Sequence, residues 1–520
     1  MNSISDERSA ENMDSFHGED SEIPSSILEA FLKSTENSGS YPCIIFDDIH
    51  FSYRTIDQMS TQLAEFLREN GCTGGMDVAI CLPMSPQFLI SYLGVIKAGS
   101  TPVILGELRK NEFAQVANLI PLKWIIMRSD SRIEPPDGSK VITARIGDLL
   151  TFMKAMRNER GHAPRAKNII STLTEIILDK VTYDHSGPEI KYSVTGFLSF
   201  SITGEPEILK FGDQVLMRKA GNCRKVLLNQ GVKFRNVSVI PPSAPEGLIF
   251  FFIIPAMTEG YTVACFQNKS LKRVLRDADI YNANFLTIIP EMLGSGKEFH
   301  LKNRDRIRGI IINSFFSPSE MKKSFTASSR IKLIEYFGTL ETCGITHISD
   351  PSSPEYLRPI ISGETFLMGE EKERISDPGK PGALWCRISE GSLNWKDDSI
   401  YLGYHAQYDT TGALIRITSD RDLGILRGRN VSGRFLEQSC GLPPHTREIA
   451  VVFTSDSGGL IYPVFYCVPD GHGKLEDKKV LTFLSENSSF LDGNGKIVWK
   501  KELPRSLSGK VLKNILLNEK

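Results

Sequence analysis

The chain has 520 residues, of which 61 are basic and 62 acidic, so its formal net charge is −1. This balance gives no indication of a nucleic-acid partner or of binding to an acidic membrane surface. Hydrophobic residues make up 41% and charged residues 24%, which is a globular composition, and the length exceeds one ordinary core. We therefore expect a globular protein of two or more domains.

Three features of the sequence concern its cellular compartment. Nine cysteines are scattered without a C-x-x-C pair, which argues against zinc and disulfide frameworks and favours a reducing compartment. Residues 1–21 are polar and acidic, unlike a signal peptide, and we expect them to be disordered. The longest apolar run, Leu248–Ile254, ends at Pro255 and is too short to span a bilayer. We expect a cytoplasmic protein without a transmembrane segment.

Strand and helix patterns alternate along the first 150 residues. Helical spacing of apolar residues predicts helices at 23–35, 55–70 and 86–98, the last two ended by Gly71 and Gly99. Apolar, β-prone runs predict strands at 43–46, 50–53, 77–82, 101–105, 124–127 and 140–142. This alternation is typical of an α/β protein with doubly wound parallel sheets.

The alternation resumes near residue 195 and then changes character. Strands are predicted at 196–202, 237–240, 261–266, 285–289, 309–312 and 331–336. A β-rich segment follows, with strands at 382–387, 401–404, 413–418 and 423–426. The last 90 residues predict a small α/β unit, with strands at 449–454, 462–468 and 496–499 and helices at 478–484 and from about 509. We expect a large domain over 22–429 and a small, mobile C-terminal domain over 430–520, with a hinge near 428–430.

The segment 333–344, with the sequence LIEYFGTLETCG, has the pattern of a buried strand that stops at a polar turn. Strand ends of this kind are where open α/β sheets bind ligands. Hydroxyl groups such as that of Thr339 donate to phosphate oxygens, and a carboxylate such as Glu341 suits Mg²⁺. The alternative is a solvated strand-to-helix turn with Thr342 as the helix cap.

Five motifs, in this order, resemble those of the AMP-forming adenylating enzymes, which include acyl- and aryl-CoA synthetases, peptide-synthetase adenylation domains and luciferase. They are FSY at 51–53, IKAGSTPVIL at 96–105, FGTLE at 337–341, TG at 411–412 with LGILRGR at 423–429, and ELPRSLSGK at 502–510. The family patterns are an early F/L-T/S-Y, LKAGA-x-x-VPL, YGxTE, TGD followed by a GR, and LPRTxxGK. The resemblance covers roughly residues 25–518.

This resemblance implies that ATP adenylates a small carboxylic acid, with Mg²⁺, and that CoA or a carrier protein then takes the acyl group. It implies roles for residues at matching positions. Glu341 would hold Mg²⁺, Arg429 would contact the ribose, and Lys510 would bridge the substrate carboxylate and the α-phosphate when the small domain closes. The remaining nucleotide-binding candidates are Thr203, Gly204, Gly338 and Thr339.

The chain departs from the family pattern mainly at the nucleotide site. The phosphate loop TSGTTGxPKG is here SFSITGEPEI, at 199–208, with Phe200 and Ser201 at small or glycine positions and Glu207 at the lysine position. A glycine-rich loop lets backbone N–H groups approach phosphate, and Glu207 adds negative charge there. Lys210, three residues on, is a candidate to substitute for the lost lysine.

Further departures lie elsewhere in the expected site. The glycine-containing turn on the adenine side is Asn313-Ser314-Phe315-Phe316, and the aromatic or histidine segment on the substrate side is PPSAPE, at 241–246. Leu340 stands at the threonine position of YGxTE, and Ala413 stands at the aspartate of TGD, whose loss removes a charge-assisted hydrogen-bond acceptor.

Three functional hypotheses follow. The first is an ATP-dependent ligase that adenylates a carboxylic acid. The second is a catalytically impaired homologue that acts as a binding or regulatory protein. The third is an unrelated α/β enzyme with chance matches. No H-E-x-x-H or G-x-S-x-G motif points to metalloprotease or serine-hydrolase chemistry. The identity of the acid, and CoA or a carrier protein as acceptor, stay open.

Overall fold

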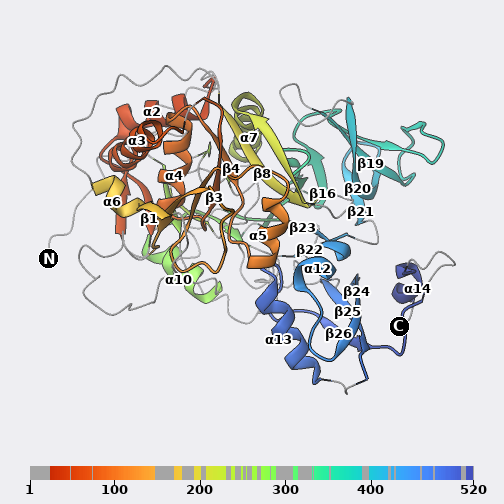
Figure 1. Ribbon diagram of the computed structural model, residues 1–520. Helices are drawn as coiled ribbons and strands as arrows, with labels where there is room; N and C mark the ends of the chain where they lie inside the picture. Colours follow the sequence, from red (N-terminus) through yellow and green to blue (C-terminus); the bar gives the residue numbers. More distant parts are fainter. Residues whose placement is uncertain are drawn as a thin grey trace.

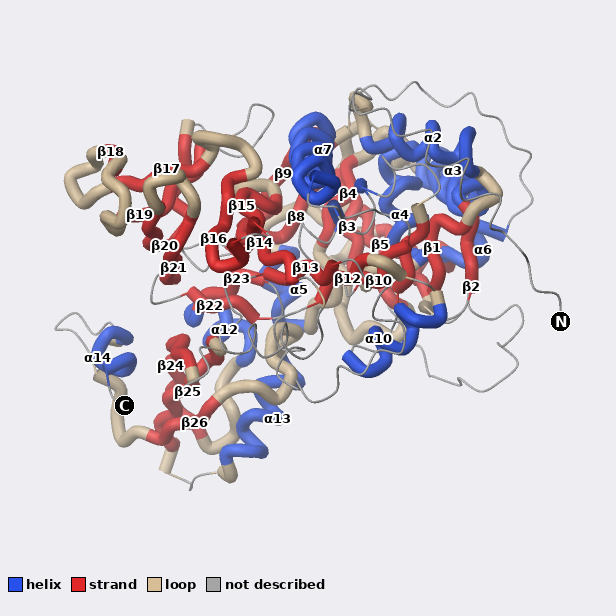
Figure 2. The backbone as a smooth tube through the Cα atoms, turned by 180° about the vertical axis from the view of Figure 1, so that it is seen from behind, coloured by secondary structure: helices blue, strands red, loops and turns tan. Residues whose placement is uncertain are grey.

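The fold comes from a computed structural model, shown in Figure 1 and from behind in Figure 2. It describes residues 24–46, 49–72, 74–146, 169–178, 193–200, 206–229, 236–239, 248–249, 253–254, 261–265, 271–281, 283–288, 309–313, 331, 333–350, 353–388, 398–419, 423–426, 429–456, 460–471, 475–504 and 511–518. The predicted N-terminal tail lies outside these residues.

A seven-stranded sheet carries the first part of the chain. Its strands, in spatial order, are β7 (Ile169–Thr172), β6 (Lys140–Ala144), β5 (Trp124–Arg128), β3 (Asp77–Cys81), β4 (Thr101–Ile104), β8 (Val194–Phe200) and β9 (Pro206–Gly212). All pairs are parallel except β8 with β9. Its flanking helices include α3 (Tyr53–Glu69), α4 (Pro86–Lys97), α5 (Lys110–Ala117) and α6 (Leu173–Leu178).

A fourteen-stranded sheet carries the middle of the chain. Its parallel part contains β14 (Leu333–Thr339), β13 (Gly309–Asn313), β12 (Phe285–Ile288), β10 (Asn236–Val239), β11 (Thr262–Cys265) and β1 (Pro42–Phe46), with β2 (Ile49–Ser52) antiparallel at the edge. Beyond β14 the sheet is antiparallel, through β15 (Gly344–Asp350), β16 (Ser353–Pro359), β21 (Leu414–Ser419), β20 (Ser399–Tyr408), β19 (Gly382–Arg387), β17 (Thr365–Met368) and β18 (Arg374–Ile375).

The C-terminal part has its own sheet of β24 (Thr446–Ser455), β25 (Ile461–Pro469) and β26 (Lys496–Trp499). The helices α12 (Gly433–Cys440), α13 (Asp477–Asn487) and α14 (Lys513–Asn518) accompany it. A two-stranded ribbon of β22 (Leu423–Leu426) and β23 (Arg429–Ser432) precedes it. Both views show this part at one end of the molecule, beside α5 (Figures 1 and 2).

Helices α3 and α4 begin at serine caps, and they pack against each other through a small and a large residue. Ser52 accepts a hydrogen bond from the N–H of Thr55 at the start of α3, and Ser85 accepts from the N–H of Phe88 at the start of α4. A side chain at Gly94 of α4 would meet Leu63 of α3 at 2.8 Å, so this glycine lets the two helices approach. The joint hydrophobic core of the two sheets and these helices is continuous.

Helix α7 (Asp213–Asn229) lies between the N-terminal helices and the β-rich region in both views (Figures 1 and 2). It follows β9 directly and contacts β15. Helices α2 (Ile27–Ser38) and α10 (Leu271–Ile280) complete the described helices of eight residues or more. Through α7 the seven-stranded sheet is connected to the turn that follows β14.

The predicted fold class, α/β with doubly wound sheets, a β-rich subdomain and a small C-terminal part, is confirmed. The alternative of a strand-to-helix turn after residue 339 is wrong, because the chain folds back into the antiparallel strand β15. Sequence patterns also missed α5, α12, β9 and β16. The domain division at 429/430 stays a proposal, and that boundary falls inside β23.

Candidate functional site

The turn after β14 is held by contacts within itself. The N–H of Thr339 donates to the Thr342 hydroxyl at 3.0 Å, and that hydroxyl lies 2.8 Å from the Thr339 carbonyl oxygen and 2.7 Å from the Gly344 carbonyl oxygen. A Cβ atom at Gly338 would lie 2.0 Å from the Gly344 carbonyl oxygen, so only glycine allows β15 to return this closely. The predicted residues Gly338 and Thr339 therefore sit in a rigid turn.

Two polar atoms of this turn have no hydrogen-bond partner within the described part of the chain. They are the Thr339 hydroxyl and the Oε2 atom of Glu341, and both atoms are buried. The other carboxylate oxygen of Glu341, Oε1, accepts a hydrogen bond from the Ser199 hydroxyl at 3.0 Å. An unpaired buried oxygen costs about 1–3 kcal/mol. A phosphate group and Mg²⁺ would satisfy a hydroxyl donor and a carboxylate, so the turn fits them.

The expected phosphate loop falls between β8 and β9. Residues 201–205, with the candidates Thr203 and Gly204, lie outside the described residues. Ser199 at the end of β8 pairs with Glu207 on β9 across the antiparallel register. Burial, together with the negative charge of Glu341, raises the pKa of Glu207 to about 7. The two carboxylates therefore approach each other near the start of the expected loop.

Lys210 does not replace the missing lysine of the loop. Its ammonium group lies 2.7 and 2.8 Å from the two carboxylate oxygens of Asp77 on β3. Lys210 is three positions from Glu207 on the same strand, so the two side chains point to opposite faces of the sheet. The strand geometry thus directs the positive charge away from Glu341.

The remaining candidates are only partly placed. Arg429 opens β23 opposite Leu426, and its side chain is not described. Lys510 lies outside the described residues, as do the segments 241–246 and 314–316. Ala413 is buried, and its N–H donates to the Asp409 carboxylate at 2.9 Å.

A buried polar network, which the sequence did not indicate, lies behind the turn. Lys219 on α7 forms an ion pair with Glu364, just before β17, and the two residues are 2% and 8% exposed. The Oε2 atom of Glu364 has no further partner among the described residues. His347 on β15 is fully buried, and burial together with the Lys219 charge lowers its pKa to about 3. Its Nδ1 lies 3.0 Å from the Thr346 hydroxyl.

The C-terminal part contacts the large part through α5. The Glu112 carboxylate accepts hydrogen bonds from the Ser488 hydroxyl at 3.1 Å and the Ser489 N–H at 2.8 Å. Asn111 donates to the Ser439 carbonyl oxygen at 3.3 Å. Glu112 is fully buried, and this burial raises its pKa. The contact fixes the C-terminal sheet relative to the seven-stranded sheet.

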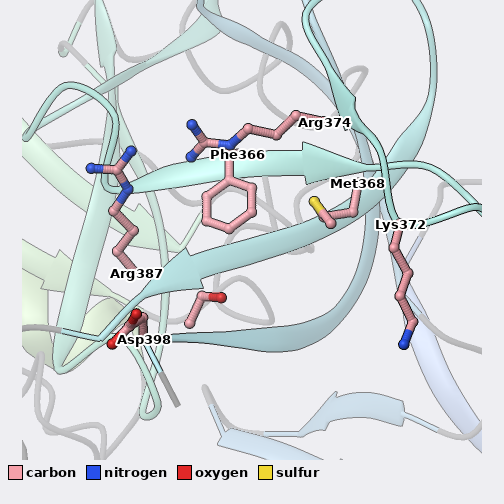
Figure 3. Close-up of a pocket in the computed structure, with 7 residues that line it drawn as sticks. Phe366, Met368, Lys372, Arg374, Arg387 and Asp398 are labelled. Carbon is pink, nitrogen blue, oxygen red and sulfur yellow. The ribbon is translucent and has the colours of Figure 1, made fainter.

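A pocket of about 630 Å³ opens on the β-rich region, away from the candidate turn (Figure 3). The guanidinium of Arg374 stacks on the Phe366 ring, 4.2 Å from its centroid. Figure 3 shows Arg387 beside this stack and Lys372 on the other side of Met368. None of the predicted site residues lines this pocket. The residues that line it are Phe366, Met368, Lys372, Arg374, Arg387, Asp398 and Ser399.

Two negative findings hold for the described ranges. They contain no group of three or more His, Cys, Asp or Glu side chains arranged to hold a metal ion. They also contain no helix of the length and apolar character that crossing a bilayer requires. A metal at Glu341 would therefore need ligands beyond a cage of protein side chains.

Known proteins resemble this chain over nearly its whole length. The family described as "AMP-binding enzyme" matches residues 31–169. The long-chain-fatty-acid–CoA ligase of Bacillus subtilis (strain 168) is 23% identical, and the match covers 96% of this chain and 95% of that protein. Gramicidin S synthase 2 of Brevibacillus brevis is 21% identical over 71% of this chain, which corresponds to 8% of that synthase.

Solved structures show the same fold at low sequence identity. A double mutant of o-succinylbenzoate CoA synthetase from Bacillus subtilis, bound with its product analogue OSB-NCoA, superposes with a TM-score of 0.71 at 17% identity, covering 94% of this chain and 97% of that one. An artificially fused adenylation–PCP di-domain NRPS from Klebsiella oxytoca superposes with a TM-score of 0.70 at 12% identity, covering 91% and 93%.

Proposed function

Because this chain belongs to the AMP-forming adenylating enzyme superfamily, we propose that it uses ATP to activate a carboxylic acid. A carboxylate oxygen of the acid attacks the α-phosphorus of ATP, and the bond from that phosphorus to the pyrophosphate oxygen breaks. The products are an acyl-adenylate and pyrophosphate. A thiol then displaces AMP and carries the acyl group away as a thioester.

The observation that carries this proposal is the turn at 339–341. It lies at the end of a parallel strand, which is where open α/β sheets bind nucleotides. It also presents a buried hydroxyl and a buried carboxylate oxygen that have no partners among the described residues. Thr339 would donate to a phosphate oxygen, and Ser199 holds the Glu341 carboxylate in place. Glu341 would hold Mg²⁺, which would supply positive charge to the phosphate groups.

Two further roles rest on the superfamily pattern. Arg429 would contact the ribose, and Lys510 would bring a compact positive charge to the α-phosphate. Catalysis of this kind consists of positioning and charge stabilisation and needs no side-chain nucleophile. The thiol would belong to CoA, as the name of the B. subtilis fatty-acid ligase suggests, or to a carrier protein, as in the adenylation–PCP fusion.

The direct test is substrate-dependent exchange of labelled pyrophosphate into ATP, screened over fatty, aryl and amino acids. We expect exchange with one class of acid and a loss of about 100- to 1000-fold in Glu341→Gln. Glu134, an exposed residue paired with Lys110, supplies the matched control Glu134→Gln, which should retain full exchange. Exchange by Glu341→Gln at the wild-type rate would contradict the proposed site.

The competing hypothesis is a homologue that binds nucleotide without reacting. Its main support is the position of Glu207 beside Glu341, where the family has a lysine. Calorimetry with ATP and Mg²⁺ separates the two functions. The silent homologue would be favoured if the folded protein bound nucleotide but catalysed no pyrophosphate exchange with any of the acids tested.

A further inference from the structure

Three side chains meet where β8, β9 and the turn after β14 come together. Ser199 and Glu207 are direct partners across an antiparallel pair, so their side chains lie on the same face of the sheet. The Ser199 hydroxyl donates to Glu341 Oε1 at 3.0 Å. Ser199 therefore contacts Glu341 and is the cross-strand neighbour of Glu207, so the two carboxylates lie near each other although they belong to different sheets.

No positive side chain offsets these two charges in the described part of the chain. Neither Glu207 nor Glu341 forms an ion pair there, and Lys210 pairs with Asp77 on the opposite face. Lys219, behind the turn, pairs with Glu364. The connecting residues 201–205 have the sequence SITGE, which adds another acid and no Lys or Arg. With no cation among the described side chains around them, the two carboxylate charges repel each other.

The unpaired oxygen atoms of the turn indicate the kind of ligand that would bind there. Thr339 is 2% exposed, and its hydroxyl has no hydrogen-bond partner among the described residues. The Oε2 atom of Glu341 also has no partner there. Thr339 shares a face of β14 with Phe337, which packs in the cluster that contains Cys386. Glu341 follows two residues later in the turn, and its Oε2 atom is buried as well. A divalent cation takes carboxylate and hydroxyl oxygens as ligands.

We propose that Glu207 and Glu341 form a two-carboxylate site that binds a divalent cation before the nucleotide arrives. Mg²⁺ is commonly held by one or two carboxylates, with its remaining positions open to water or phosphate oxygens. The ion would supply the positive charge that a lysine at position 207 supplies in the family pattern. This inference rests on the proposed function, and it assigns Glu207, the most conspicuous departure from that pattern, a role in the reaction.

The test measures binding of Mn²⁺ to the full chain without nucleotide, by loss of the free Mn²⁺ electron paramagnetic resonance signal. Wild type should bind one Mn²⁺, which Mg²⁺ displaces. Glu207→Gln and Glu341→Gln should each bind about tenfold more weakly or worse, whereas Glu134→Gln should bind like wild type. Melting temperatures confirm that each variant is folded, and added Mn²⁺ should raise that of wild type more than that of Glu207→Gln.

Glu207→Lys, which restores the family residue, gives a second measurement. It should abolish binding of Mn²⁺ alone and make nucleotide binding less dependent on added metal. Wild-type affinity for Mn²⁺ in Glu207→Gln, or no Mn²⁺ bound to wild type at about 1 mM, would overturn the inference. Mn²⁺ binding without pyrophosphate exchange would leave this site standing and refute the proposed function, and exchange without Mn²⁺ binding would do the reverse.

Discussion

Lys219 and Glu364 form a buried ion pair whose disruption gives a quantitative prediction. The two residues are 2% and 8% exposed, and Glu364 Oε2 has no second partner among the described residues. In Lys219→Met the Glu364 carboxylate would remain buried without its counter-charge. Breaking a buried pair from one side costs about 3–5 kcal/mol, which is a large fraction of the 5–15 kcal/mol that typically stabilises a domain. We expect the free energy of unfolding to fall by that amount.

The double variant Lys219→Met/Glu364→Met should recover most of this loss. It removes both charges and fills the space with apolar atoms, a change that is often neutral. Unfolding in urea at pH 7.5 measures both variants, and the double-mutant cycle isolates the interaction. The exposed pair Lys110–Glu134 is the matched control, and Lys110→Met should change stability by less than about 1 kcal/mol.

Two results would refute this reasoning. A loss below about 1 kcal/mol in Lys219→Met would mean that water reaches the pair. A double variant as destabilised as the sum of the single variants would mean that the two groups act independently. The pair joins α7 to the segment before β17, so a large loss would also be expected to loosen the turn at Glu341.

Three further predictions concern single contacts. Gly338→Ala should lower the melting temperature, measured by calorimetry, because the added Cβ would lie 2.0 Å from the Gly344 carbonyl oxygen, and overpacking of this kind costs about 1–3 kcal/mol or more. Burial raises the pKa of Asp213 from 3.8 to about 6, so its stabilising contribution is complete below pH 3.8 and is lost as the pH rises through 6. Between pH 3.8 and 6, the free energy of unfolding of wild type, measured in urea, should fall by at most about 3 kcal/mol because of this group. Asp213→Asn should remove this dependence of stability on pH. Glu112→Ala should release the C-terminal part, because it leaves the Ser488 hydroxyl and the Ser489 N–H unpaired at about 1–3 kcal/mol each, and limited proteolysis should then cut between the two parts faster.

The fold was predictable where hydrophobic periodicity was undisturbed. Strand β3 and helix α4 are apolar runs of the expected lengths, ended by a turn and by glycine. Strand β15 was missed because polar side chains occupy its buried positions, among them Thr346, His347 and Ser349. Their burial depends on hydrogen bonds to other strands, and local sequence does not reveal these. The Thr346 hydroxyl, for example, donates to the Phe337 carbonyl oxygen on β14 at 3.1 Å.

The candidate site was predictable in part for a similar reason. Glycine, threonine and glutamate within five residues at a strand end indicated the turn, and the structure gives that turn its unpaired oxygens. The contact of Ser199 with Glu341 joins residues 142 positions apart, and the pair Lys219–Glu364 joins residues 145 positions apart. Partners at such separations leave no periodic signal, so the buried network behind the turn could not be predicted.

From the residues around Glu341 we infer that a bound cation, not a protein side chain, offsets the negative charge of its carboxylate. Ser199 holds one carboxylate oxygen from β8, and the Thr342 contacts and the close return at Gly338 fix the turn that carries it. The carboxylate therefore cannot turn toward water at low cost, and the buried Lys219 on α7 is already paired with Glu364. A rigid carboxylate with an unpaired oxygen and a second carboxylate beside it is unfavourable alone and favourable once a cation binds. For the proposed adenylation, this favours a site that the cation occupies first and to which the nucleotide then binds.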